Sequence, residues 1–216
     1  MQGMITIFKR KHLHFRGLPD IRGVLRRYGG AMLFSLTLAG GLLSGSLFSS
    51  GLSESLRSKL DLLFVMNLPS RLRSGALGAF CASFGSGFLF IAAAFLCGLS
   101  LWGIAGLPFI AFFKGFGIGV SAGYLFSTYG VKGIFFYLLV LLPGVCVFCT
   151  ALVLQLSSSL YMCRRMLGVI FKKNEAQIRG ATAFFLRKTA VCLIMTLLSS
   201  LLDVLLWYAL SGVFIK

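Results

Sequence analysis

Acidic residues are scarce in this sequence. Five Asp and Glu residues stand against 21 Lys and Arg residues in a chain of 216, and only 12% of the residues are charged. A soluble domain carries about twice that charged fraction. The five acids are scattered along the chain, at Asp20, Glu54, Asp61, Glu175 and Asp203. This scarcity argues against a soluble fold and leaves no evident pair of carboxylates for acid–base catalysis.

Histidine is nearly absent, and the cysteines do not form a recognisable ligand set. The two histidines, His12 and His14, lie in the basic N-terminal segment. Cys146 and Cys149 have C-x-x-C spacing within an apolar run. No second cysteine pair or nearby histidine completes a zinc site around them. We therefore expect no catalytic residues, no metal site and no cofactor.

Long apolar runs are what the sequence has instead. Hydrophobic residues make up 58% of the chain, and several runs reach the length of about 20 residues that spans a bilayer. We predict an all-α, polytopic integral membrane protein with about five transmembrane helices. The predicted spans are 30–51, 76–101, 107–127, 133–160 and 190–214. After the first span, leucines at positions 52, 56, 60 and 63 have helical spacing, which predicts a short amphipathic helix.

Two basic blocks predict the organisation and the orientation of the chain. Seven bases and one acid lie in 1–28, and the same numbers lie in 161–189. We predict a basic cytoplasmic N-terminal segment at 1–28, a membrane core at 29–160, a basic cytoplasmic loop at 161–189, and a fifth span with a short outer tail at 190–216. Cytoplasmic loops of membrane proteins are enriched in Lys and Arg. This rule predicts that the N-terminus lies in the cytoplasm and the C-terminus lies outside.

The same basic residues predict the kind of partner that the chain contacts. They lie beside membrane spans, which favours contact with anionic lipid. No nucleic-acid-binding module is recognisable in the sequence, so we expect no nucleic-acid partner.

Small residues in two spans predict close helix packing. Gly115, Gly119 and Gly123 are spaced four apart, as are Gly41 and Gly45 in the first span. Small residues let helix backbones approach closely in a bilayer, where packing drives helix association. These glycines either pack the spans within their own chain or dock a partner's span. A second copy of the chain would be one such partner, giving a homo-oligomer.

A few polar residues lie within the predicted spans. Lys114 either extends its ammonium group toward the cytoplasmic surface or pairs with Asp203, and Asp203 either makes that pair or is protonated and bonded to a serine. Gln155 is a further intramembrane polar residue, and a helix break is predicted at Pro143 and Gly144. Polar groups and broken helices inside a membrane often line a transport path. They support a transporter or permease subunit as an alternative function.

A longer motif surrounds these residues, in the stretch GIAGLPFIAFFKGFGIGVSAGYLFSTYGVKGIFFYLLVLLPGVCVFCTALVL. It joins a Gly–Pro turn, a K-G-F-x-x-G-x-x-x-G segment, a G-x-x-G turn and a span with an L-P break. This pattern resembles the core of the stage II sporulation protein M family. The matching residues are Gly106, Pro108, Lys114, Gly115, Phe116, Gly119, Gly123, Gly130, Gly133, Leu142 and Pro143. The chain departs from the family where Gly144, Val145 and Cys146 follow the proline, because related sequences often have a polar residue or His there.

The resemblance implies a non-enzymatic membrane scaffold. The family member of spore-forming bacteria anchors a complex with two peptidoglycan-degrading proteins at the septal membrane, so that the mother cell can engulf the forespore. By this resemblance we expect membrane-anchored cell-wall hydrolases as partners.

Overall fold

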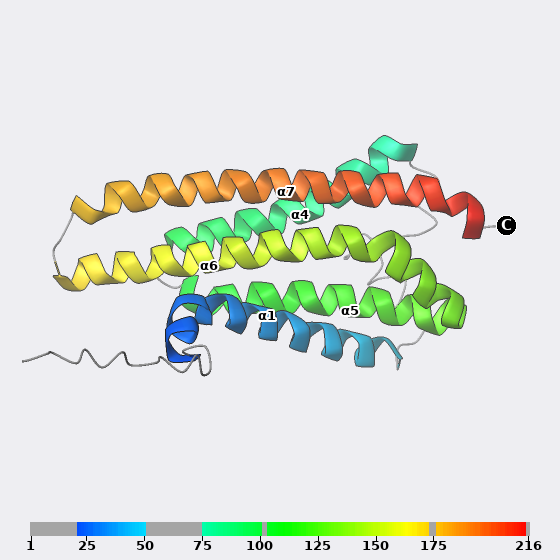
Figure 1. Ribbon diagram of the computed structural model, residues 1–216, viewed down its shortest axis with the longest axis horizontal. Coiled ribbons are helices and arrows are strands. Elements are labelled where there is room, and N and C mark those ends of the chain that lie inside the picture. Colours follow the sequence, from blue (N-terminus) through cyan, green and yellow to red (C-terminus); the bar gives the residue numbers. More distant parts are fainter. Residues whose placement is uncertain (1–20, 51–74, 101–102, 173–175, 215–216) are drawn as a thin grey trace, which may run out of the picture.

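The computed structural model describes residues 21–50, 75–100, 103–172 and 176–214. They form a bundle of long helices (Figure 1), with no strand among the described residues. The elements are α1 (Ile21–Ser50), α4 (Gly75–Leu99), α5 (Gly103–Phe136), the π-helix η1 (Tyr137–Leu141), α6 (Leu142–Lys172) and α7 (Ala176–Phe214). The predicted all-α class is confirmed.

Five helical segments in the described part of the chain are long and apolar enough to cross a membrane. They are Gly29–Ser49, Leu77–Leu99, Gly103–Ser127, Gly133–Gly168 and Thr182–Ala209. Each overlaps one predicted span, so the prediction of about five transmembrane helices is confirmed. The amphipathic helix predicted at Leu52 to Leu63 lies outside the described residues, as do residues 1–20 of the basic N-terminal segment.

The predicted loop at 161–189 is instead almost wholly helical. Helix α6 continues to Lys172 and α7 begins at Ala176, so the loop prediction was wrong for most of this segment. Lys and Arg are good helix formers, and no proline follows Pro143 to interrupt either helix. The fifth span accordingly begins at Thr182, earlier than the predicted residue 190.

A left-handed glycine separates the third and fourth spans. Gly130 has φ 58° and ψ −138°, and a Cβ atom added there would meet nothing within 4 Å. The backbone conformation therefore requires glycine at this position, because side chains with a Cβ rarely adopt it. Beyond this residue the chain turns back toward α6 at one end of the bundle (Figure 1).

The fourth span is bent where it contains proline. The π-helix η1 ends two residues before Pro143, which cannot donate a backbone hydrogen bond. A π-helical turn accommodates the displaced hydrogen-bond pattern. Ser199 of α7 then donates a hydrogen bond of 2.7 Å to the carbonyl oxygen of Gly144. The break is thus held by a contact from another helix, and Figure 1 shows the chain bending there.

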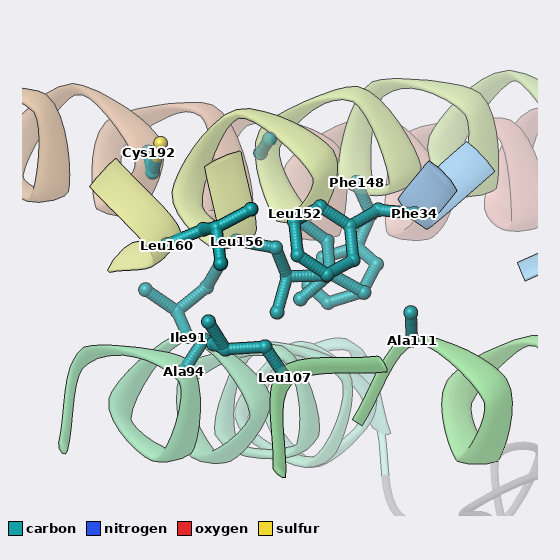
Figure 2. Packing of buried hydrophobic residues seen from close by; sticks show 11 residues of the cluster. Phe34, Ile91, Ala94, Leu107, Ala111, Phe148, Leu152, Leu156, Leu160 and Cys192 are labelled. Atoms are coloured by element: carbon teal, nitrogen blue, oxygen red, sulfur yellow. The ribbon is translucent and has the colours of Figure 1, made fainter. Parts of the chain in front are cut away.

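Helix α6 lies at the centre of the bundle, in contact with α1, α4, α5 and α7. Its residues Phe148, Leu152, Leu156 and Leu160 recur every four positions and point toward Ile91 of α4 and Leu107 of α5 (Figure 2). Large apolar side chains on the outer surface, such as Leu36 and Leu77, are 77% and 81% exposed. Apolar side chains outward and small polar side chains inward suit a bundle surrounded by lipid.

Candidate functional site: polar groups inside the bundle

The glycines of α5 lie directly against the backbone of α1. A Cβ atom added at Gly115 would overlap the carbonyl oxygen of Leu38, and one added at Gly119 would overlap the carbonyl oxygen of Leu42. Gly123 continues this row toward the end of α1. Each backbone contact is possible only because the side chain is a hydrogen atom.

The glycines of α1 meet α5 in the same way. Added Cβ atoms at Gly41 and Gly45 would overlap the carbonyl oxygens of Phe112 and Phe116. The structure therefore places both predicted glycine rows in one contact within the chain. No space remains there for a methyl group, so a partner's helix reaches these glycines only if α1 and α5 separate.

Lys114 extends from α5 into an aromatic environment between α4 and α6. Its Nζ atom lies 4.7 Å from the ring centroid of Phe90 and 4.7 Å from that of Phe148. Aromatic faces attract a cation, with about 2 kcal/mol or more where the pair is removed from water. These two rings stabilise a charge that the apolar interior would otherwise disfavour.

Asp203 lies on α7 where α4 and the broken part of α6 meet it. Ser83 of α4 donates a hydrogen bond of 3.1 Å to Oδ2 of Asp203. A Cβ atom added at Gly144 would lie 3.3 Å from Cβ of Asp203, so a larger residue at 144 would crowd this contact. Asp203 is 7% exposed. A carboxyl group in this position is costly in a membrane and is a functional hypothesis by default.

Lys114 and Asp203 both enter the part of the bundle that α4 and α6 form. Lys114 lies beside Phe90 and Phe148, and Asp203 lies beside Ser83 and Gly144. The contacts of these two side chains differ. Two aromatic rings lie beside the Lys114 ammonium group, whereas a serine hydroxyl donates a hydrogen bond to Asp203. We define Lys114, Asp203 and Ser83 as the charged cluster.

Gln155 lies elsewhere in the bundle, on the part of α6 that follows Phe148. Its side chain is completely buried, and Nε2 donates a hydrogen bond of 3.1 Å to Oγ1 of Thr189 on α7. Thr189 donates in turn to the carbonyl oxygen of Phe185, at 3.0 Å. Oε1 of Gln155 has no hydrogen-bond partner among the described residues. Gln155 therefore links α6 to α7, about two turns along α6 from the rings around Lys114.

A row of small, mostly polar residues leads to Asp203 along α7, and the sequence analysis named only Asp203 among them. Apart from the adjacent Ser199 and Ser200, these buried residues recur every three or four positions, so they lie on one side of the helix. They are Thr189, Cys192, Thr196, Ser199, Ser200 and Asp203. The periodic spacing of hydroxyl residues in an otherwise apolar span was the available signal.

Glycines on neighbouring helices face this row. A Cβ atom added at Gly87 of α4 would lie 2.6 Å from Cγ2 of Thr196, and Gly144 of α6 lies against the backbone of Ser199. Thr196 donates its hydroxyl hydrogen to the carbonyl oxygen of Cys192 at 2.8 Å. Small polar residues opposite glycine allow close packing while their hydroxyls remain hydrogen-bonded.

Within the part of the chain that the structure describes, no three His, Cys, Asp or Glu side chains gather at one place. The charged cluster contains one cation, one carboxyl group and one hydroxyl group. Comparison with known proteins finds no match among protein-family models, curated proteins or solved structures. The fold and the five candidate spans define the class of this protein, a multi-pass, all-α membrane protein.

Proposed function

We propose that this chain is a non-enzymatic membrane scaffold that anchors peptidoglycan-degrading partners at the sporulation septum during engulfment. The proposal rests on the resemblance of its central motif to the stage II sporulation protein M family. In this proposal the chain lies in a bacterial cell membrane, with the N-terminus in the cytoplasm and the C-terminus outside.

The observation that carries the proposal is the structural role of the motif residues. Gly115 and Gly119 hold α5 against α1, Gly130 forms the turn between spans, and Pro143 bends the fourth span. Lys114 packs between two aromatic rings. A motif that builds a bundle in this way supports a docking protein, whose task is to present a shaped surface to its partners.

The outer surface of the bundle, rather than the glycine contact, is where a partner's span would dock. Leu36 on α1, Leu77 on α4 and Ile194 on α7 are 77%, 81% and 67% exposed. They project from three different helices. Ile91 of α4 is fully buried and serves as the matched control.

Site-specific photo-crosslinking in the native cells tests the proposal. A photoreactive amino acid replaces Leu36, Leu77, Ile194 or Ile91 in turn, and cells are irradiated during sporulation. We expect crosslinks to cell-wall hydrolases from one of the exposed faces and none from position 91. Crosslinks to lipid alone from all three faces would contradict the scaffold, and crosslinks to a second copy would show a homo-oligomer.

The charged cluster favours a second candidate, a transporter or permease subunit. A lysine and a carboxyl group both lie against a helix that is bent at Pro143, and such polar groups often line transport paths. Lys114→Met and Asp203→Asn would then abolish transport by chains that still fold. The scaffold predicts that both folded variants keep their crosslinked partners, so the same experiment on these variants distinguishes the two functions.

A further inference from the structure

The helical hairpin formed by α6 and α7 extends beyond the rest of the bundle. Figure 1 shows both helices running past the ends of α4 and α5 on one side. Cys163 of α6 marks the position along the hairpin at which α4 ends. Its Sγ atom lies 3.2 Å from the carbonyl oxygen of Cys97 and 3.4 Å from that of Ser100, where α4 ends. Residues of α6 beyond Cys163 are therefore outside the five-helix part.

Exposed basic residues lie near this level on both helices of the hairpin. Arg164 directly follows Cys163 on α6, and Arg187 and Lys188 of α7 lie within one turn of Phe185, which packs with Met162 of α6; all three are exposed. We call these three residues the basic rim. Exposed aromatic side chains accompany them: Tyr161 is 45% exposed, and Phe184 is 49% exposed. Aromatic residues beside Lys and Arg are typical of the interface between a membrane and water.

The geometry of Lys188 indicates where its charge lies. Its Nζ atom is 4.7 Å from the ring centroid of Phe184, one helical turn closer to the start of α7. The flexible stem thus carries the ammonium group away from the apolar part of the span and toward the protruding end of the hairpin.

The charges of the basic rim are not balanced by nearby acids in the described part of the chain. Asp203 is the one acidic residue that the structure describes, and it lies beside Gly144, on the far side of Gln155 along α6. The start of the first span lies at the same end as the rim, because a Cβ atom added at Gly30 would be 3.3 Å from Leu160. This end of the bundle therefore presents cations to an anionic partner.

We propose that the basic rim is a binding site for the phosphate groups of anionic phospholipids in the surrounding bilayer. Arginine and lysine bind phosphate by charge-assisted hydrogen bonds. The lipid, rather than a soluble anion, is favoured because the exposed aromatic side chains of Tyr161 and Phe184 accompany these bases, a combination typical of a membrane interface. The inference does not depend on the proposed scaffold function and holds for either candidate.

Native mass spectrometry of the full chain in mild detergent tests the site. Phosphatidylglycerol or phosphatidylcholine with identical acyl chains is added, and the bound lipids are counted. We expect the wild type to prefer phosphatidylglycerol. The variant R164Q/R187Q/K188Q should bind it on the order of 100-fold more weakly, or about fivefold for each base. The variant K9Q/R10Q/K11Q removes the same charge from the N-terminal segment and should lose less affinity than the rim variant, because the rim residues rather than net charge alone hold the lipid.

Three outcomes would overturn the assignment. The wild type could bind both lipids equally, the rim variant could bind phosphatidylglycerol as tightly as the N-terminal variant, or a mixed-sequence RNA oligonucleotide could displace the lipid. The last result would assign the rim to nucleic acid. Gel filtration and circular dichroism verify folding. If the triple variant does not fold, Arg187→Gln replaces it and should weaken binding about fivefold.

Discussion

The α1–α5 contact and the α4–α6–α7 contact bring helices together by different chemistry. In the first, glycines on both helices lie against backbone carbonyls, as Gly41 and Gly119 show. In the second, glycines such as Gly87 face buried hydroxyl residues such as Thr196. The first contact depends on the absence of side chains, whereas the second contains side chains that donate and accept hydrogen bonds.

This difference locates the part of the bundle in which chemistry is possible. In the glycine contact, backbone lies mainly against backbone, and no titratable side chain is among the atoms that meet these glycines. The second contact contains Asp203 and Gln155, and Lys114 reaches into it from α5. The predicted packing residues and the predicted polar residues thus belong to two separate regions. Substitutions in the two regions should therefore destabilise the protein for different physical reasons and by different amounts.

The largest effect is expected from Gly119→Leu. The side chain would overlap the carbonyl oxygen of Leu42, so α1 and α5 would have to separate. Overpacking of this kind costs about 1–3 kcal/mol and more where backbone is displaced, and we expect little folded protein. Gly40→Leu is the matched control, since a Cβ atom added at Gly40 meets nothing within 4 Å. Thermal unfolding in mild detergent compares the two, and equal midpoints would contradict the packing.

The α1–α5 contact shows how much of the helix packing could be predicted from the sequence alone. The four-residue spacing of Gly115, Gly119 and Gly123 predicts close packing, because it depends on helix geometry alone. The helix that packs against these glycines was left open, because the sequence does not indicate which two glycine rows lie against each other. The structure supplies that missing fact by bringing Gly41 and Gly45 to the same contact.

Other features could not be predicted for related reasons. The extension of α6 to Lys172 was missed because a run of basic residues resembles a loop in composition, although its residues form helix well. The break at Pro143 was expected, but the π-helix before it depends on how the freed backbone groups find partners. The placement of Lys114 and Asp203 depends on how α5 and α7 each pack against α4 and α6, which the sequence does not give.

An intermediate effect on stability is expected for Lys114 and Asp203, which are ionisable residues of the second contact. A double-mutant cycle of Lys114→Met and Asp203→Asn measures the coupling free energy between the two residues. Asn keeps an acceptor for the Ser83 hydroxyl, so the cycle removes charge while leaving that hydrogen bond possible. We expect a coupling of about 1 kcal/mol, in the range of neighbouring groups in one network.

The control cycle combines Lys114→Met with Gln155→Leu. Gln155 bonds to Thr189, about 10 Å along α6 from Phe148, so this pair should be additive within about 0.5 kcal/mol. Additivity in both cycles would show that the two charges do not interact. The transport alternative would then lose the observation that favours it.

The smallest effect is expected from a hydroxyl group within the second contact. Ser199→Ala removes the 2.7 Å hydrogen bond to the carbonyl oxygen of Gly144, which joins α7 to the bent part of α6. Such bonds between membrane helices contribute about 0.6 kcal/mol. Ser35→Ala is the control, because Ser35 is exposed and its hydroxyl donates to Ala31 within α1. Unfolding in mild detergent should show a loss for Ser199→Ala and almost none for Ser35→Ala. If Ser199→Ala instead destabilises as much as Gly119→Leu, the hydroxyl contact tolerates change no better than the glycine contact, and the distinction between the two regions fails.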